Sequence, residues 1–104
     1  MKEAVFLKNR DKYERVEISN IMYVEADGSY SKVVTLDGVY SITVNLQTVY
    51  KKINHPFFLR VHRSYIVNIQ CITSFDNHHV FIDDIAIPYS KARKGELMSH
   101  LHKL

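Results

Sequence analysis

The chain has 104 residues, 46% of them hydrophobic and 24% charged, with a formal net charge of +3 at pH 7. This length predicts a single domain spanning residues 1–104, and the composition excludes a disordered chain, which would be poor in apolar residues and strongly charged. One cysteine excludes an internal disulfide framework, and no signal peptide or membrane-length apolar run is present, so we expect a cytoplasmic protein.

The N-terminal part of the chain is predicted to form short strands joined by tight turns. Polar residues 9–12 separate the first two apolar segments, which indicates a hairpin. Gly28 lies in a second turn, and Asp37-Gly38 is the strongest hairpin signal in the chain. The predicted strands cover residues 4–8, 13–18, 21–26, 30–36 and 39–44.

The hydrophobic period changes at Asn45, where a helix is predicted to begin. Asparagine is a favoured helix N-cap, and the segment is expected to end before His55-Pro56, because the residue before proline disfavours helical geometry. The apolar side chains follow the spacing of one helical face, at Leu46, Val49, Tyr50 and Ile53.

Residues 58–68 alternate in hydrophobicity as a half-buried strand does, and Arg63 interrupts the apolar positions. A guanidinium stays charged and is costly to bury unpaired. We therefore predict one strand that bends or bulges at Arg63 and directs this side chain outward. An exposed guanidinium suits an anionic or guanine-like partner.

The C-terminal part is predicted to contain a further hairpin and a final helix. The hairpin joins residues 80–82 to residues 85–87 through Asp83-Asp84. Ser90 is the expected N-cap of the helix, with an apolar stripe at Leu97, Leu101 and Leu104. Many short strands with two short helices predict a mostly β domain.

The central stretch also resembles a known family. Phe58-Leu-Arg-Val-His-Arg-Ser64, followed by Ile66-Val-Asn68, is similar to the signature of the LytTR family of bacterial DNA-binding domains. Weaker matches lie in the expected order along almost the whole chain, at residues 21–26, Gly28, Tyr30, residues 46–53 and residues 88–91. The resemblance implies an elongated set of small antiparallel sheets with one or two short helices, which contacts DNA through loops.

The resemblance also implies a function. Relatives bind double-stranded DNA sequence-specifically as bacterial transcriptional regulators, many of them as output domains of two-component response regulators. The implied partners are repeated DNA half-sites bound by two copies, and a receiver domain or sensor kinase outside this chain. No cofactor is implied.

Three segments carry the candidate DNA contacts. Hydroxyls and ammonium groups suit phosphate, and the Arg63 guanidinium can pair with guanine. Cations in the first turn of the final helix are unfavourable, because this is the positive end of the helix dipole. A phosphate bound there would be stabilised by both the dipole and the cations. We expect the segments to share one face, with Tyr30 mainly packed. The candidates are Ser31, Lys32, His62, Arg63, Ser64, Lys91 and Arg93.

Each candidate also has an ordinary structural interpretation. The segment around Ser31 is by itself typical of a solvated loop, and Arg63 can equally form a salt bridge with a nearby acid. His62 is about as well explained by a structural hydrogen bond. Exposed cations near a helix start cost only tenths of a kcal/mol.

Other functional classes fit the residues less well. His62 and Ser64 lack a partnered acid or a G-x-S-x-G elbow, so no catalytic residues are predicted and an enzyme is not expected. The histidines lack metal-ligand spacing, so no metal site is predicted. The alternative function is a small β-rich module that binds a protein or RNA.

Overall fold

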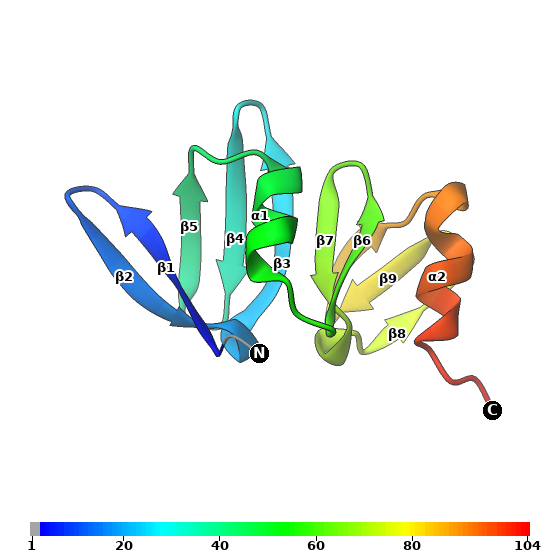
Figure 1. Cartoon of the computed structure of the whole chain (residues 1–104). Helices are drawn as coiled ribbons and strands as arrows, with labels where there is room; N and C mark the ends of the chain where they lie inside the picture. Colours follow the sequence, from blue (N-terminus) through cyan, green and yellow to red (C-terminus); the bar gives the residue numbers. More distant parts are fainter. Residues whose placement is uncertain (1–2) are drawn as a thin grey trace.

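Short strands and tight turns make up most of the chain, and the computed structural model describes residues 3–104 (Figure 1). The strands are β1 (Ala4–Asn9), β2 (Lys12–Glu17), β3 (Ile21–Asp27), β4 (Tyr30–Thr35), β5 (Gly38–Ile42), β6 (Phe58–His62), β7 (Tyr65–Asn68), β8 (Ser74–Phe75), β9 (His79–Ile82) and β10 (Ile85–Pro88). The helices are α1 (Leu46–Ile53) and α2 (Lys94–Ser99), with 3-10 turns η1 (Ile18–Asn20), η2 (Ile69–Cys71) and η3 (Lys91–Arg93).

The strands form three antiparallel sheets. The β1–β2 hairpin stands alone, five strands follow the order β5-β4-β3-β7-β6, and three follow β10-β9-β8. The molecule extends 46 Å along its longest axis and about half of that along the other two, at 26 and 25 Å. This confirms the predicted mostly β, elongated architecture of small antiparallel sheets with two short helices.

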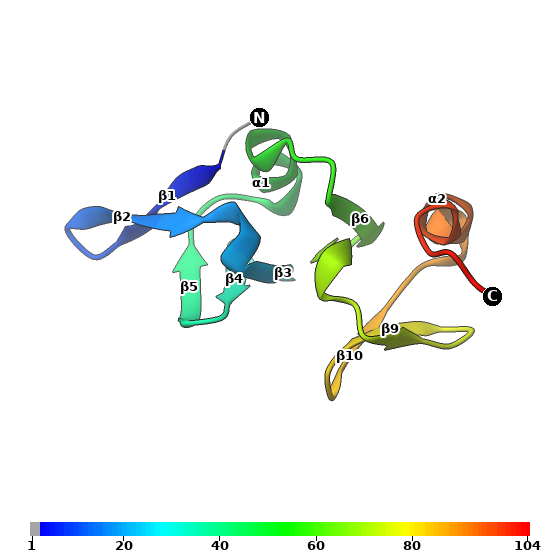
Figure 2. The ribbon, with the colours of Figure 1, turned by 90° about the horizontal axis from the view of Figure 1, so that it is seen from below.

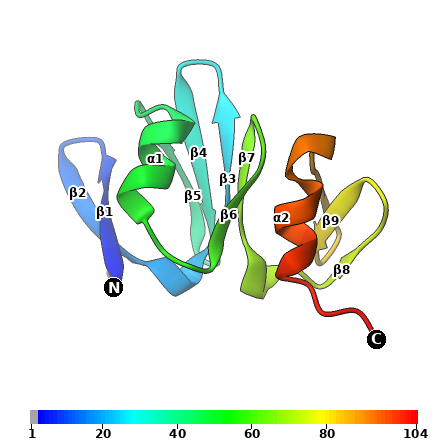
Figure 3. The same ribbon diagram turned by 45° about the vertical axis from the view of Figure 1, so that its right-hand side comes forward.

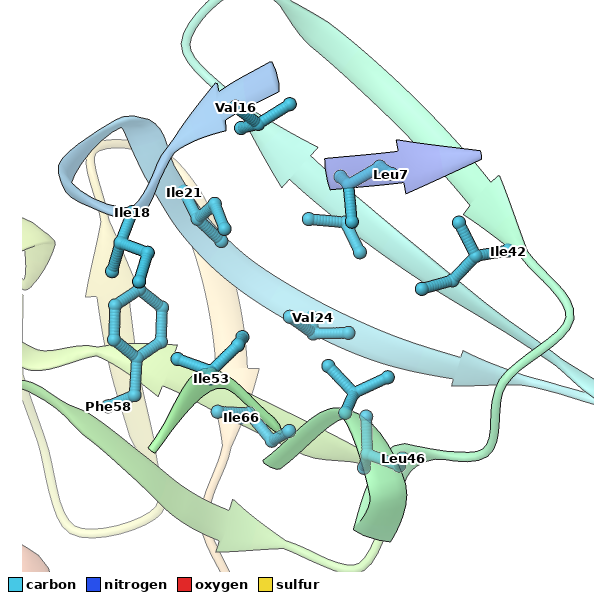
Figure 4. Packing of buried hydrophobic residues seen from close by; sticks show 12 residues of the cluster. Leu7, Val16, Ile18, Ile21, Val24, Ile42, Leu46, Ile53, Phe58 and Ile66 are labelled. Atoms are coloured by element: carbon cyan, nitrogen blue, oxygen red, sulfur yellow. The ribbon is translucent and has the colours of Figure 1, made fainter. Parts of the chain in front are cut away.

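The first hydrophobic core lies on one face of the five-stranded sheet. Figure 2 shows the β1–β2 hairpin and α1 on the same side of this sheet, and Figure 4 shows the side chains that pack between them. Val24 of β3 and Ile66 of β7 are fully buried there, beside Ile53 of α1. The Asn45 side chain accepts a hydrogen bond from the Thr48 N–H at 2.9 Å, which confirms the predicted helix cap.

A second core joins β6 and β7 to the C-terminal part of the chain. Val61 and Val67 are fully buried against residues of β9, β10 and α2, among them Ile87 and Leu97. Figure 3 shows α2 and β9 at this end of the molecule. The β6–β7 hairpin therefore contributes side chains to both cores, which places its turn between the two halves of the domain.

The prediction of one bent strand at residues 58–68 is wrong, because the chain reverses at Arg63-Ser64 to form the β6–β7 hairpin. A register shift between Arg60 and His62 brings Leu59 opposite Val67. Because paired residues share a face, this bulge keeps odd-numbered apolar residues together on both strands. The hydrophobic alternation along residues 58–68 therefore looks like that of a single strand, although the chain forms two.

The predicted final helix is also corrected. It is divided into η3 and α2, and it ends at Ser99, before two of the three leucines expected on its stripe. Leu97 is fully buried, Leu101 is half-buried beyond the helix, and Leu104 is fully exposed. Ser90 contributes its backbone rather than a side-chain cap, since its N–H donates to the Val61 carbonyl at 2.8 Å.

None of the helices formed by residues 3–104 has the length and apolarity that a bilayer crossing needs.

Candidate nucleic-acid interface

Three connections lie along one edge of the molecule, at the top of Figures 1 and 3. They are the β3–β4 turn (residues 27–30), the β6–β7 turn (Arg63-Ser64) and η3, and together we name them the loop edge. Backbone hydrogen bonds hold them in a row: the Ala26 N–H donates to the Ser64 carbonyl at 2.9 Å, and the Ser90 N–H donates to the Val61 carbonyl at 2.8 Å. The segments predicted to share one face are thus adjacent.

The β6–β7 turn presents Arg63 to solvent, as predicted. The Ser64 N–H donates to His62 Nδ1 at 3.0 Å, which requires the imidazole tautomer with its proton on Nε2. The His62 ring also lies edge-on to the Tyr65 ring, with centroids 5.8 Å apart. His62 therefore has a structural hydrogen bond within the turn and still presents an Nε2–H donor.

Arg60 is a functional candidate that the sequence analysis did not select. Its Nη2 donates to the Arg63 carbonyl at 2.6 Å, and its Nε donates to the His62 carbonyl at 3.3 Å. Burial, and then the like charge of Arg93, lower the pKa of the Arg60 guanidinium from its usual range. The signal in the sequence was a second arginine, three residues before Arg63 in the same stretch.

Ser31 does not lie where the sequence analysis placed it. Its side chain is 0% exposed, and its Oγ donates to the Val44 carbonyl at 2.6 Å. Ser31 and Val33 face the first core, so the alternation of β4 turns their neighbours outward. The Ser31 hydroxyl is therefore bonded inside the fold, whereas the predicted DNA contact needs this side chain on the surface.

The outward neighbours of Ser31 are Tyr30 and Lys32. Tyr30 is 47% exposed in the β3–β4 turn, which corrects the expectation that it is mainly packed, and Ser29 is exposed beside it. Lys32 is half-buried on the outer face of the sheet, directly across from Glu25 of β3. Because its side chain is half-buried, Lys32 is a weaker candidate for a DNA contact than the exposed turn residues.

The cations of η3 complete the loop edge. Lys91 is exposed, and Arg93 is half-buried. Because α2 has only six residues and begins after Arg93, the predicted phosphate site on a helix N-terminus is not retained. At η3, the groups that can bind an anion are the side chains of Lys91 and Arg93.

Residues 11–102 match the family model of the LytTr DNA-binding domain. The chain belongs to the LytTr family. It is a DNA-binding domain, which the resemblance of the central stretch had predicted.

Individual relatives agree with this assignment. Over 62 residues, or 60% of the chain, the sequence is 39% identical to the CO-responsive transcriptional regulator RcoM of Rhodospirillum rubrum, of which this match covers 26%. The LytTr domain of a methyl-accepting/DNA response regulator from Bacillus cereus superposes with a TM-score of 0.82 and 24% identity, covering 99% of this chain and 100% of that one. The latter similarity supports the LytTr fold.

Proposed function

We propose that this LytTr domain is the output part of a bacterial transcriptional regulator and binds double-stranded DNA sequence-specifically in the cytoplasm. The observation that carries the proposal is the loop edge, where exposed Arg63 and Lys91 and half-buried Arg93 come from segments tied together by backbone hydrogen bonds. Cations aligned along one edge suit the phosphate backbone, and a guanidinium at a turn can reach a base edge. The role is binding rather than catalysis.

Each residue has a distinct proposed role. Arg63 reads a base, since a guanidinium can pair with guanine O6 and N7. Lys91 and Arg93 contact phosphates, and the Nε2–H of His62 and the hydroxyl of Ser64 add hydrogen bonds near the turn. Ser29 and Tyr30 replace Ser31 as the contacts from the β3–β4 turn, because both are exposed.

Selection of bound duplexes from a random pool tests the proposed function. We expect one enriched motif, and its affinity should fall steeply with salt as phosphate contacts are screened. Single-stranded RNA of the same length is the competitor at two salt concentrations. Equal affinity for both nucleic acids, or an unenriched pool, would exclude sequence-specific duplex recognition and favour the RNA or protein module.

The family assignment also motivates the assembly that we propose. Two copies bind repeated half-sites separated by about one helical turn, or a multiple of it, so that both lie on one DNA face. A receiver domain or a sensor kinase controls the regulator in a two-component system. Spacing variants of the selected motif, measured by the stoichiometry of the complex, test the first point: a single copy bound at every spacing would exclude paired binding.

A further inference from the structure

Two arginines, Arg60 and Arg93, lie at the junction between the β6–β7 turn and η3. The Ser90 N–H donates to the Val61 carbonyl, which brings η3 against β6, and the guanidinium charges of Arg60 and Arg93 interact unfavourably there. Neither guanidinium forms an ion pair with a carboxylate among residues 3–104. Two half-buried like charges without a carboxylate between them favour an external anion.

Arg60 has a second role in the same place. Its Nε and Nη2 donate to the carbonyls of His62 and Arg63, the two residues that enter the turn. A guanidinium has more N–H donors than these two bonds use, so it can hold the turn and an anion at the same time. The anion would lie beside the turn whose outermost side chain is Arg63.

We propose that Arg60 and Arg93 together bind one phosphodiester of the DNA backbone, while Arg60 acts as the positioning residue that fixes the turn carrying Arg63. The inference rests on the proposed function and adds a site to it: a phosphate clamp, one arginine of which also positions the base-reading turn. The negative charge of the phosphate offsets the repulsion between the two like charges, and the turn geometry that Arg60 imposes sets where Arg63 meets its base.

The anion site is tested first without DNA. Inorganic phosphate, exchanged for chloride at constant ionic strength, should raise the melting temperature of the full chain. The increase should be smaller in Arg93→Gln, whereas Lys91→Gln, which removes the same charge from an exposed neighbour, should keep the wild-type increase. Equal increases in all three proteins would overturn the site. This measurement tests the anion site without DNA. If the protein does not bind duplex DNA, the proposed function is wrong, but the result for the anion site still holds.

The positioning role is tested on the selected duplex. Arg60→Lys keeps the charge but loses the planar fork, so it should keep the wild-type salt slope while discrimination at the base read by Arg63 falls about tenfold. Arg93→Gln should do the opposite, lowering the salt slope by about one unit with discrimination retained. Discrimination unchanged in Arg60→Lys, or a slope unchanged in Arg93→Gln, would overturn the proposal. Arg93 lies in a turn, so its variant remains informative even if Arg60→Lys does not fold.

A single neutral methylphosphonate moved along the duplex locates the phosphate. One position should weaken the wild-type complex strongly and have little effect on Arg93→Gln, because that variant no longer contacts it. Lys91→Gln is the control and should remain sensitive at that position. Loss of sensitivity at different positions in Arg60→Gln and Arg93→Gln would show that the arginines do not share one phosphate.

Discussion

At the scale of single residues, the direction of a side chain decides whether a polar group serves the fold or the DNA. Ser31 and Lys32 are adjacent, yet the first is fully buried and bonded to Val44 while the second lies on the outer face. Arg60 and Arg63 differ in the same way: one holds the turn, and the other extends from it. Polar chemistry alone does not separate these roles.

Arg63→Ala should remove base reading without unfolding the domain. We expect a loss of about 1–3 kcal/mol of discrimination at one base position. Lys91→Ala is the matched control: it should weaken all sequences alike and lower the salt slope by about one unit. Both side chains are exposed, so melting temperatures should change little. Affinities for duplexes in which each base is varied in turn distinguish the two variants. If Arg63→Ala weakened binding to all sequences equally, the base-reading role of Arg63 would be contradicted.

Ser31→Ala should reduce stability and leave DNA affinity unchanged. The substitution removes the hydrogen bond to the Val44 carbonyl inside the fold, which should cost about 1 kcal/mol in the free energy of unfolding. Urea denaturation measures this loss. The control is Ser29→Ala at the exposed turn, which should affect DNA binding and not stability. A folded Ser31→Ala protein with weakened DNA binding would restore Ser31 as a contact.

At the scale of elements, turns and caps follow local chemistry, whereas helix length follows packing. Asn45 caps α1 as predicted, because the cap bond forms within four residues. The end of α2 was not predicted, because the leucine spacing continues past Ser99 while the core ends near Leu101. Local propensity favours a helix in this segment, and the burial of its apolar side chains in the core determines where the helix ends.

Leu97→Ala should destabilise the domain by about 2–5 kcal/mol, since Leu97 is fully buried in the second core. Leu104→Ala, at a fully exposed position of the same predicted stripe, should have no measurable effect. Denaturant unfolding of the two variants tests the corrected helix directly. Comparable losses in both would mean that the C-terminal segment packs as first predicted.

The β8–β9 turn should make stability depend on pH in the acid range. Asp76 Oδ1 accepts hydrogen bonds from the N–H groups of His78 and His79 at 2.8 and 2.7 Å, and these bonds lower the pKa of the Asp76 carboxyl below its usual range. Because the folded pKa is depressed, the stabilisation is fully present above the unfolded pKa and is lost as pH falls through the folded one.

Asp76→Asn tests this dependence, since the amide does not titrate. The difference in denaturant midpoint between wild type and variant should be present at neutral pH and shrink below about pH 4. Asp83→Asn in the neighbouring turn is the control. A wild-type advantage that grows toward low pH would contradict the assigned direction.

At the scale of the whole molecule, the two cores hold the loop edge in place. The β6–β7 hairpin packs Ile66 into one core and Val67 into the other, so the hairpin that carries the turn is anchored in both halves. Ala26, just before the β3–β4 turn, and Ser90, just before η3, each donate a backbone hydrogen bond to this hairpin. A rigid row of loops can contact successive phosphates without a recognition helix.

Duplex DNA should therefore perturb one edge of the domain. In a titration followed by NMR, we expect the backbone amides of Ser29, Ser64 and Lys91 to shift together. The amides of the β4–β5 turn, near Asp37, should stay unchanged, because this turn lies at the opposite edge in Figure 1. Shifts at the β4–β5 turn without shifts at the loop edge would contradict the proposed interface.

The amino-acid sequence by itself determined the kinds of elements, most turn positions, the cap of α1 and the exposure of Arg63, because each depends on neighbours within a few residues. Only the tertiary structure decided that Ser31 faces inward, that Arg63 belongs to a hairpin turn and that Arg60 lies near Arg93. Alternation along a strand defines two faces without saying which is buried, and strand register and the docking of η3 on β6 depend on residues far apart in the chain.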